Sequence, residues 1–399
     1  MPSLSEFLRS RGIRLHPFFI NHQIYAAAGF WYNDTPKKWK NVLYGFYRTC
    51  VFFSITITAI NQILDIYLLL DKPTQLATDL CAITVTIMVF CKVNMLSYKS
   101  HMTEKLQEDI MRIRLSRNSP EDEEVWNSAS SMIYTMTKVF YAMGAPCVLC
   151  WIFFPALDGL SRKLLPYPVV FPVNPHESPF YELIYIGQSL SLFGYLFSIV
   201  SIDLSYCAYV VLAIAQMEIL GRDIKRISSG SEIVEADSDT EEEKTKKVVQ
   251  DLKKCIDFHN EILRQLDAVH DIHSDSFFIQ MSLTALMIAV VIVDTILNSS
   301  GLSLKLFQRV LYTACGLFDT WIQCYWGSQL QQKSYDLVAD IYDSQWVDME
   351  TKVKKIFLFM TMKAQKVPRL RNGIFDFGLP LFLEILRYSY NAAALIMNT

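Results

Sequence analysis

Residues 359–399 read FMTMKAQKVPRLRNGIFDFGLPLFLEILRYSYNAAALIMNT, and this stretch decides the fold. A basic amphipathic segment comes first, a glycine interrupts it, and about 25 mostly apolar residues follow, which is enough for a helix that crosses a bilayer. This last segment also carries Pro380, Glu384, Arg387 and Asn391, which a helix surrounded by lipid would rarely contain. We therefore expect it to pack against other protein or to line water.

The whole chain has the composition of a membrane protein with several spans. Of its 399 residues, 52% are hydrophobic and only 19% are charged, whereas about a quarter of a soluble domain is charged. The apolar residues form long blocks that charged blocks separate. Seven blocks are long enough for helical spans: residues 42–70, 76–98, 132–156, 183–215, 277–297, 302–326 and 374–398. The predicted fold class is therefore an all-α membrane protein with seven transmembrane helices.

Positive charges are distributed unevenly between the two sides that these spans define. Of the 37 Lys and Arg residues, 28 fall on the side of the N-terminus and four on the opposite side. Cytoplasmic loops are enriched in Lys and Arg. The asymmetry predicts a cytoplasmic N-terminus and, after seven spans, an extracellular C-terminus.

This topology divides the chain into six segments. They are a cytoplasmic N-terminal segment (1–41), a bundle of helices 1–4 for a ligand pocket (42–215), a cytoplasmic loop with a helix extension (216–276), helices 5 and 6 (277–326), a cytoplasmic anchor helix (327–373) and the last helix (374–399). Helical spacing predicts that the fifth span continues below the membrane and that residues 335–362 form one amphipathic helix. Such helices cannot bury their apolar stripes alone, so we expect them to pack together or across subunits.

Signatures of enzymes are absent from the sequence. The phosphate-binding, dinucleotide-binding, zinc-protease and serine-hydrolase motifs do not occur, so we expect neither catalysis nor a cofactor. Cys147 and Cys150 form a CxxC pair without a second pair, and we interpret them as buried thiols. His270 and His273 could share a metal, but a solvated helix surface is the favoured interpretation. No metal site is predicted.

Charged residues inside the spans are more informative. Lys92 and Asp203 would each cost about 2.5–3.5 kcal/mol if they stood alone at the centre of a bilayer. We therefore predict that both face the protein interior and form a candidate intramembrane pair. Asp294 and Asp319 lie near the predicted ends of their spans, where we expect contact with water.

The last span carries two stripes at helical spacing. The polar stripe consists of Pro380, Glu384, Arg387, Asn391 and Asn398, and the adjacent apolar stripe consists of Leu379, Leu383, Leu386, Tyr390, Ala393 and Met397. In one interpretation the polar stripe lines a water path. In the other, the polar stripe is supported by neighbouring helices and the apolar stripe forms a hydrophobic constriction. The residues alone leave both open.

The outer halves of several spans are aromatic and weakly polar. Small residues and a proline next to aromatic rings leave room for a small apolar ligand, although ordinary helix packing explains the same pattern. The candidate ligand contacts are Ile83, Thr86, Gly144, Cys147, Trp151, Tyr185, Gln188, Ser189, Phe307, Gln308 and Leu311. The aromatic lining favours an aromatic or heteroaromatic ligand. The proline-rich outer loop, residues 157–182, is either a lid over the helix ends or the entrance to this pocket.

The C-terminal third contains four short elements in order: Ala339, Tyr342 and Trp346; Met362, Gln365 and Pro368; Gly373 and Phe375; and Phe382, Leu386, Ser389 and Tyr390. In these elements and their order the chain resembles the insect odorant receptor family. The resemblance is clear for about the last seventy residues, whereas length and topology agree over the whole chain.

The resemblance implies an odorant-gated, non-selective cation channel in the plasma membrane of olfactory sensory neurons. Tuning subunits of this family assemble with a co-receptor into heterotetramers, and the last helix lines the pore. The family pattern implies a gate at Tyr390, Ala393 and Met397, with Glu384 and Arg387 in structural support. A long intracellular insert of the co-receptor type is absent, so the chain resembles a tuning subunit, with a small volatile molecule and the lipid bilayer as further partners and no nucleic acid.

Three other classes fit less well. A gustatory receptor, the nearest alternative, shares the topology but usually ends in a Gln-Phe element that is absent here. A secondary transporter should contain paired broken helices in two halves, and no such pair is evident. A G-protein-coupled receptor needs an extracellular N-terminus, which the charge distribution opposes.

Overall fold

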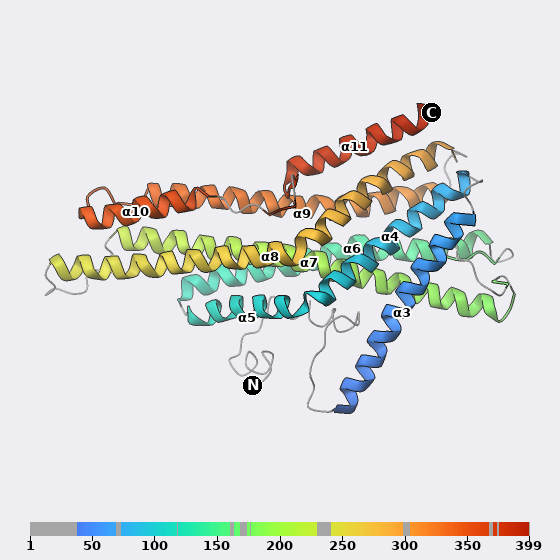
Figure 1. Ribbon diagram of the computed structural model, residues 1–399, viewed down its shortest axis with the longest axis horizontal. Helices are drawn as coiled ribbons and strands as arrows, with labels where there is room; N and C mark the ends of the chain where they lie inside the picture. Colours follow the sequence, from blue (N-terminus) through green and yellow to red (C-terminus); the bar gives the residue numbers. More distant parts are fainter. Residues whose placement is uncertain are drawn as a thin grey trace.

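The chain folds into long helices with a single short hairpin in the part that the structure describes. This computed structural model describes residues 38–68, 73–117, 119–159, 163–167, 174–175, 177–229, 241–297, 304–366, 370–372 and 375–398. The helices are α3 (Lys38–Leu68), α4 (Pro73–Tyr98), α5 (Ser100–Ser116), α6 (Pro120–Gly159), α7 (Phe180–Ser228), α8 (Glu241–Leu297), α9 (Leu304–Tyr342), α10 (Thr351–Ala364) and α11 (Leu379–Asn398), and the strands are β1 (Arg371–Asn372) and β2 (Phe375–Asp376). Figure 1 shows most of them running along one common direction.

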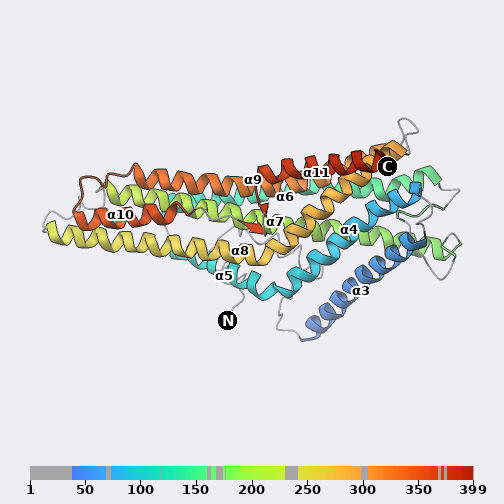
Figure 2. The same cartoon turned by 45° about the horizontal axis from the view of Figure 1, so that its top comes forward.

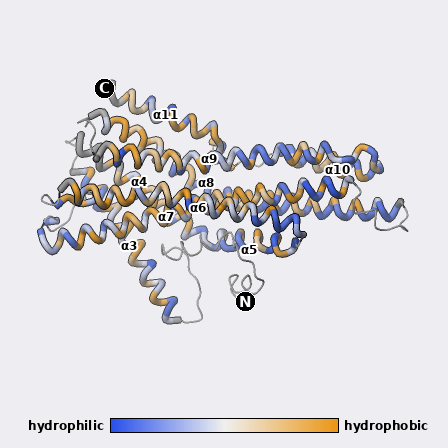
Figure 3. The backbone as a smooth tube through the Cα atoms, turned by 180° about the vertical axis from the view of Figure 1, so that it is seen from behind, coloured by the Kyte–Doolittle hydropathy of each residue, from blue (hydrophilic) through white to orange (hydrophobic). Residues whose placement is uncertain are grey.

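Each of the seven predicted spans lies largely within a helix, namely α3, α4, α6, α7, α8, α9 or α11. By length and composition, four described stretches can cross a membrane: Trp39–Tyr67, Pro120–Pro155, Phe180–Ser228 and Glu242–Val293. A shorter apolar stretch in α4 covers Ala82–Tyr98. Apolar residues predominate where α3, α4, α6 and α11 lie, and hydrophilic residues become frequent toward α10 (Figure 3).

Helix α8 is continuous from Glu241 to Leu297, which confirms that the fifth span has a long helical extension. The extension buries one face at helical spacing, with Leu252, Ile262 and Leu266 in the core. Helix α7 lies at the centre of the molecule and packs against α6, α8 and α9 (Figure 2). Burial all round α7 explains why its sequence lacks a polar face between residues 200 and 213.

The prediction of one helix over residues 335–362, within the anchor segment 327–373, was wrong. Helix α9 ends at Tyr342, a turn follows, and α10 begins at Thr351. In the turn, the hydroxyl of Ser344 donates to the carbonyl of Ile341 at 2.7 Å, and the Trp346 ring stacks on Phe357 with centroids 6.4 Å apart. The chain turns back because α10 can then bury its apolar face against α8 and α9.

The start of α11 is held by close packing. Strands β1 and β2 pair antiparallel, and the Phe377 ring that follows them lies 3.8 Å from the Phe277 ring of α8. The amide of Leu379 donates to the Ser328 hydroxyl of α9 at 2.9 Å. Gly327 allows this approach, since a Cβ atom there would lie 2.0 Å from the carbonyl oxygen of Phe377. Helix α11 is therefore attached to both α8 and α9 where it begins.

This close approach predicts that Gly327→Ala is strongly destabilising. The added methyl group has to displace backbone, and overpacking of this kind costs about 1–3 kcal/mol or more. We expect a melting temperature several degrees lower for the purified receptor in detergent. Gly45→Ala is the matched control, because a Cβ atom at Gly45 meets nothing within 4 Å. Equal melting temperatures for both variants and the wild type would contradict this account of the hairpin.

Candidate ligand cavity and pore helix

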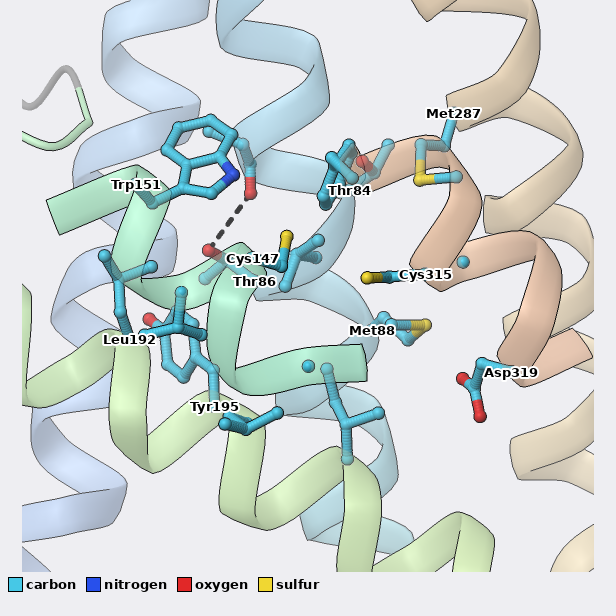
Figure 4. A pocket seen from close by; sticks show the side chains of 18 of the residues that line it. Thr84, Thr86, Met88, Cys147, Trp151, Leu192, Tyr195, Met287, Cys315 and Asp319 are labelled. Atoms are coloured by element: carbon cyan, nitrogen blue, oxygen red, sulfur yellow. Dashed lines mark hydrogen bonds between the residues drawn. The ribbon is translucent and has the colours of Figure 1, made fainter. Parts of the chain in front are cut away.

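A cavity of about 170 Å³ lies among α3, α4, α6, α7, α8 and α9. Figure 4 shows Trp151 of α6, Leu192 and Tyr195 of α7, and Cys315 of α9 around it. Most of the lining is apolar. The cavity therefore suits a small apolar molecule with few polar groups.

Aromatic rings and a glycine shape one side of the cavity. Trp151 meets Tyr312 edge-on with centroids 6.0 Å apart, and Phe140 meets Phe318 at 5.7 Å. Gly144 sits opposite Leu196, and a Cβ atom at Gly144 would lie 2.3 Å from the Leu196 side chain. The glycine thus lets α6 and α7 approach closely beside the open space.

Four of the residues predicted as ligand contacts line the cavity: Thr86, Gly144, Cys147 and Trp151. Seven do not. Ile83 is buried outside the lining, while Phe307, Gln308 and Leu311 lie nearer the start of α9 than the lining residues of that helix.

The predicted contacts on α7 have structural partners instead of facing the cavity. The Gln188 amide donates to the carbonyl of Tyr167 at 2.9 Å, the Tyr185 hydroxyl donates to the carbonyl of Ile152, and the Ser189 hydroxyl donates to the carbonyl of Tyr185 at 2.8 Å. The cavity lies deeper, at Leu192 and Tyr195. The role of Tyr185, Gln188 and Ser189 as ligand contacts stays a prediction, and the cavity begins about one helical turn further along α7.

The expectation that Asp319 would be wet was also wrong, because it is buried at one end of the cavity. Its carboxylate accepts hydrogen bonds from the amides of Gln280 at 2.7 Å and Gln323 at 3.4 Å. The Gln323 amide also donates to the Gln280 side-chain oxygen at 3.1 Å. These three side chains, which we name the amide triad, join α8 to α9. Asp294 lies outside the residues whose side chains the structure describes.

Lys92 of α4 and Asp203 of α7 meet in the interior. The ammonium nitrogen lies 2.6 and 2.7 Å from the two carboxylate oxygens, and both side chains are almost fully buried. Burial removes hydration from both charges, so each side chain depends on the other. The structure therefore joins the two charges that the sequence indicated as a pair.

The described residues of the predicted gate differ in exposure. Tyr390 is 68% exposed, whereas Ala393 is 1% exposed and continues the buried stripe of Leu381, Ile385 and Ser389. Glu384 and Arg387 are exposed, and the Met397 side chain lies outside the described residues. The pore role of this set stays a prediction.

Residues 72–390 match the family model described as 7tm Odorant receptor. The chain belongs to the insect odorant receptor family. It is 26% identical over 278 residues to odorant receptor 46a, isoform A, of Drosophila melanogaster, an alignment that covers 69% of this chain and 70% of the relative. It is 24% identical over 332 residues to odorant receptor 47a of the same species, covering 78% and 81%.

Solved structures agree with the fold. The insect olfactory receptor OR5 from Machilis hrabei superposes with a TM-score of 0.81 at 15% identity and covers 98% of both chains. The same receptor in complex with eugenol gives 0.81 at 14% identity, covering 95% of this chain and 97% of that one. The seven-helix, all-α prediction is thereby confirmed. As an odorant receptor, the chain is a multi-pass membrane receptor and not an enzyme.

The buried charge pair predicts a strong non-additive effect of mutation. Lys92→Met leaves Asp203 buried without its counter-charge, which costs about 3–5 kcal/mol. The double variant Lys92→Met/Asp203→Leu removes both charges and is expected to recover much of that loss. Surface labelling and melting temperature in detergent measure both. A single variant that reaches the surface and melts like the wild type would show that the pair is dispensable.

Proposed function

We propose that this receptor is the ligand-tuning subunit of an odorant-gated, non-selective cation channel. A small volatile molecule binds the cavity and favours the open state of a pore that α11 lines. The observation that carries the proposal is a mostly apolar cavity between the helices, whose end at Asp319 is connected through α8 to the start of α11.

The size and lining of the cavity indicate the ligand class. A volume of about 170 Å³ is close to that of an engineered apolar cavity of about 150 Å³ that binds benzene. Trp151, Tyr312 and Phe140 supply ring edges and faces, which favour an aromatic or heteroaromatic molecule. One structure of similar fold is a complex with eugenol, which supports a small-molecule ligand for this chain as well.

A continuous set of contacts leads from the cavity to α11. Asp319 lines the cavity and bonds to Gln280 of the amide triad. One turn earlier on α8, the Phe277 ring contacts the ring of Phe377, which lies two residues before the start of α11 at Leu379. A ligand that binds more tightly when these helices have shifted to the open arrangement stabilises the open state. The closed–open equilibrium then changes by the difference between the ligand's affinities for the two states.

The pore assignment follows from the uncovered face of α11. Tyr390, with Ala393 and Met397, is proposed to form the gate, and Glu384 and Arg387 are proposed to support the helix against neighbouring subunits. Polar side chains of a spanning helix face protein or water and not lipid. We therefore propose a heterotetramer with the co-receptor in the plasma membrane of olfactory sensory neurons, with the N-terminus cytoplasmic and the C-terminus extracellular.

The family match favours this function over a gustatory-type channel. The model described as 7tm Odorant receptor spans residues 72–390, so the assignment no longer depends on the last seventy residues alone. The test is to express the chain with the co-receptor and to record currents against a broad volatile panel. Currents that require G-protein signalling, or an extracellular N-terminus in surface labelling, would overturn the proposal.

Trp151→Ala tests the cavity within this function. Loss of the ring enlarges the cavity and removes the edge-on contact to Tyr312, so the rank order of active volatiles should change while surface expression is preserved. Phe153→Ala is the matched control, because this exposed ring of α6 does not line the cavity. Loss of surface expression with an unchanged rank order would make Trp151 a packing residue.

A further inference from the structure

The polar groups on one side of the cavity gather between α3, α4 and α7. The hydroxyls of Thr58 and Thr86 lie near that of Tyr195, but each of them donates to a carbonyl of its own helix. Gln62 follows Thr58 by four residues on α3, so both lie on the same face of that helix. Gln62, Thr86 and Tyr195 all line the cavity. An otherwise apolar cavity therefore has a polar wall.

Two groups in this wall have no hydrogen-bond partner among the described residues. They are the side-chain oxygen of Gln62 and the hydroxyl of Tyr195. Gln62 is only 4% exposed and Tyr195 only 5% exposed, so bulk water reaches neither freely. Buried polar atoms without partners are uncommon in folded proteins, and each one needs an explanation.

Other polar groups around the cavity are already satisfied. The Thr86 hydroxyl donates to the carbonyl of Ala82 at 3.3 Å, and the Cys315 thiol donates to the carbonyl of Met143 at 3.4 Å. The Asp319 carboxylate accepts hydrogen bonds from the side-chain amides of Gln280 and Gln323. Unlike these neighbours, the side-chain oxygen of Gln62 and the hydroxyl of Tyr195 lack a hydrogen-bond partner among the described residues.

The chemistry of the two groups differs, and the difference selects a ligand. An amide oxygen only accepts hydrogen bonds, whereas a phenol hydroxyl donates one and accepts others. A ketone, ester or ether can accept from Tyr195 but has no hydrogen to give to Gln62. A hydroxyl group can do both.

We propose that the cavity selects a small, otherwise apolar alcohol or phenol, whose hydroxyl donates to the side-chain oxygen of Gln62 and accepts from the hydroxyl of Tyr195. The inference rests on the proposed function, because it names the ligand class of the same cavity. The aromatic side of the cavity holds the apolar part of the molecule, and the polar wall orients it.

The test uses the full chain expressed with the co-receptor. Alcohols and phenols of about six to ten carbons are chosen to match a cavity of about 170 Å³. Each is compared with the matched methyl ether and aldehyde. We expect the alcohol to act at a concentration at least about tenfold lower than its ether, because a site built to pair with a hydroxyl rejects analogues that lack it. Gln62→Leu and Tyr195→Phe should each remove most of this preference while the ether response persists.

Matched controls separate the cavity from general effects on the protein. Asn94→Leu removes an exposed amide of α4, and Tyr141→Phe removes a buried hydroxyl that does not line the cavity. Both controls should keep the full preference for alcohols. If Gln62→Leu does not reach the cell surface, Tyr195→Phe, which retains the ring, and the ranking by the wild type decide.

The outcomes are distinct. Equal potency of alcohols and their ethers in the wild type overturns the proposal, and so does a preference that survives both cavity variants. Responses confined to volatiles without a hydroxyl overturn it as well but leave the proposed function standing. No response to any volatile, in cells where the co-receptor itself conducts, overturns the proposed function and this inference together.

Discussion

The rest of the helix bundle depends on the pairing of Lys92 with Asp203. Neither charge can be left alone in an apolar interior, so α4 and α7 have to meet at the one register that brings them within 2.7 Å. The amide triad acts similarly between α8 and α9, where Gln280 reaches Asp319 at 2.7 Å. Apolar packing alone tolerates sliding, whereas directional bonds between buried polar groups do not. Together these contacts align four helices at one level of the bundle.

This polar layer separates two regions of different character. On one side lies the cavity, whose lining of mostly apolar side chains and two glycines leaves space between helices. On the other side α7 is almost completely buried, α8 and α9 pack against it, and α10 packs on those two helices. A ligand in the cavity therefore contacts α7, α8 and α9 near the ends where space remains between the helices, while their opposite ends are closely packed. The contact of Phe377 with Phe277 joins α8 to the start of α11.

The sequence predicted those features that depend on long blocks or on single costly residues. Seven apolar blocks correspond to helices because backbone polar groups in the hydrocarbon region have to bond to one another, and a helix satisfies them within one segment. Lys92 and Asp203 were recognisable because a lone charge is so unfavourable in that region. The turn after Tyr342 was missed because helical spacing continues through it, and only the contact of Trp346 with Phe357 reveals the reversal. Asp319 was misjudged because only its distance from the end of the span was considered. The amides of Gln280 and Gln323, which allow its carboxylate to be buried, cannot be recognised from that distance. Gln62 gave no signal, since its importance lies in facing a cavity made by five other helices.

Helix α11 shows how the fold of one chain implies neighbours. Its buried stripe of Leu381, Ile385, Ser389 and Ala393 packs on α8 and α9, which uses one face of the helix. At 100° per residue, Glu384 and Arg387 point to the opposite side, where the described part of this chain offers no cover. Hydrocarbon is an unfavourable environment for that side, so water or another subunit has to meet it. The polar residues that distinguish this segment in the sequence therefore place α11 at the boundary between this subunit and the water or neighbouring subunit that faces it.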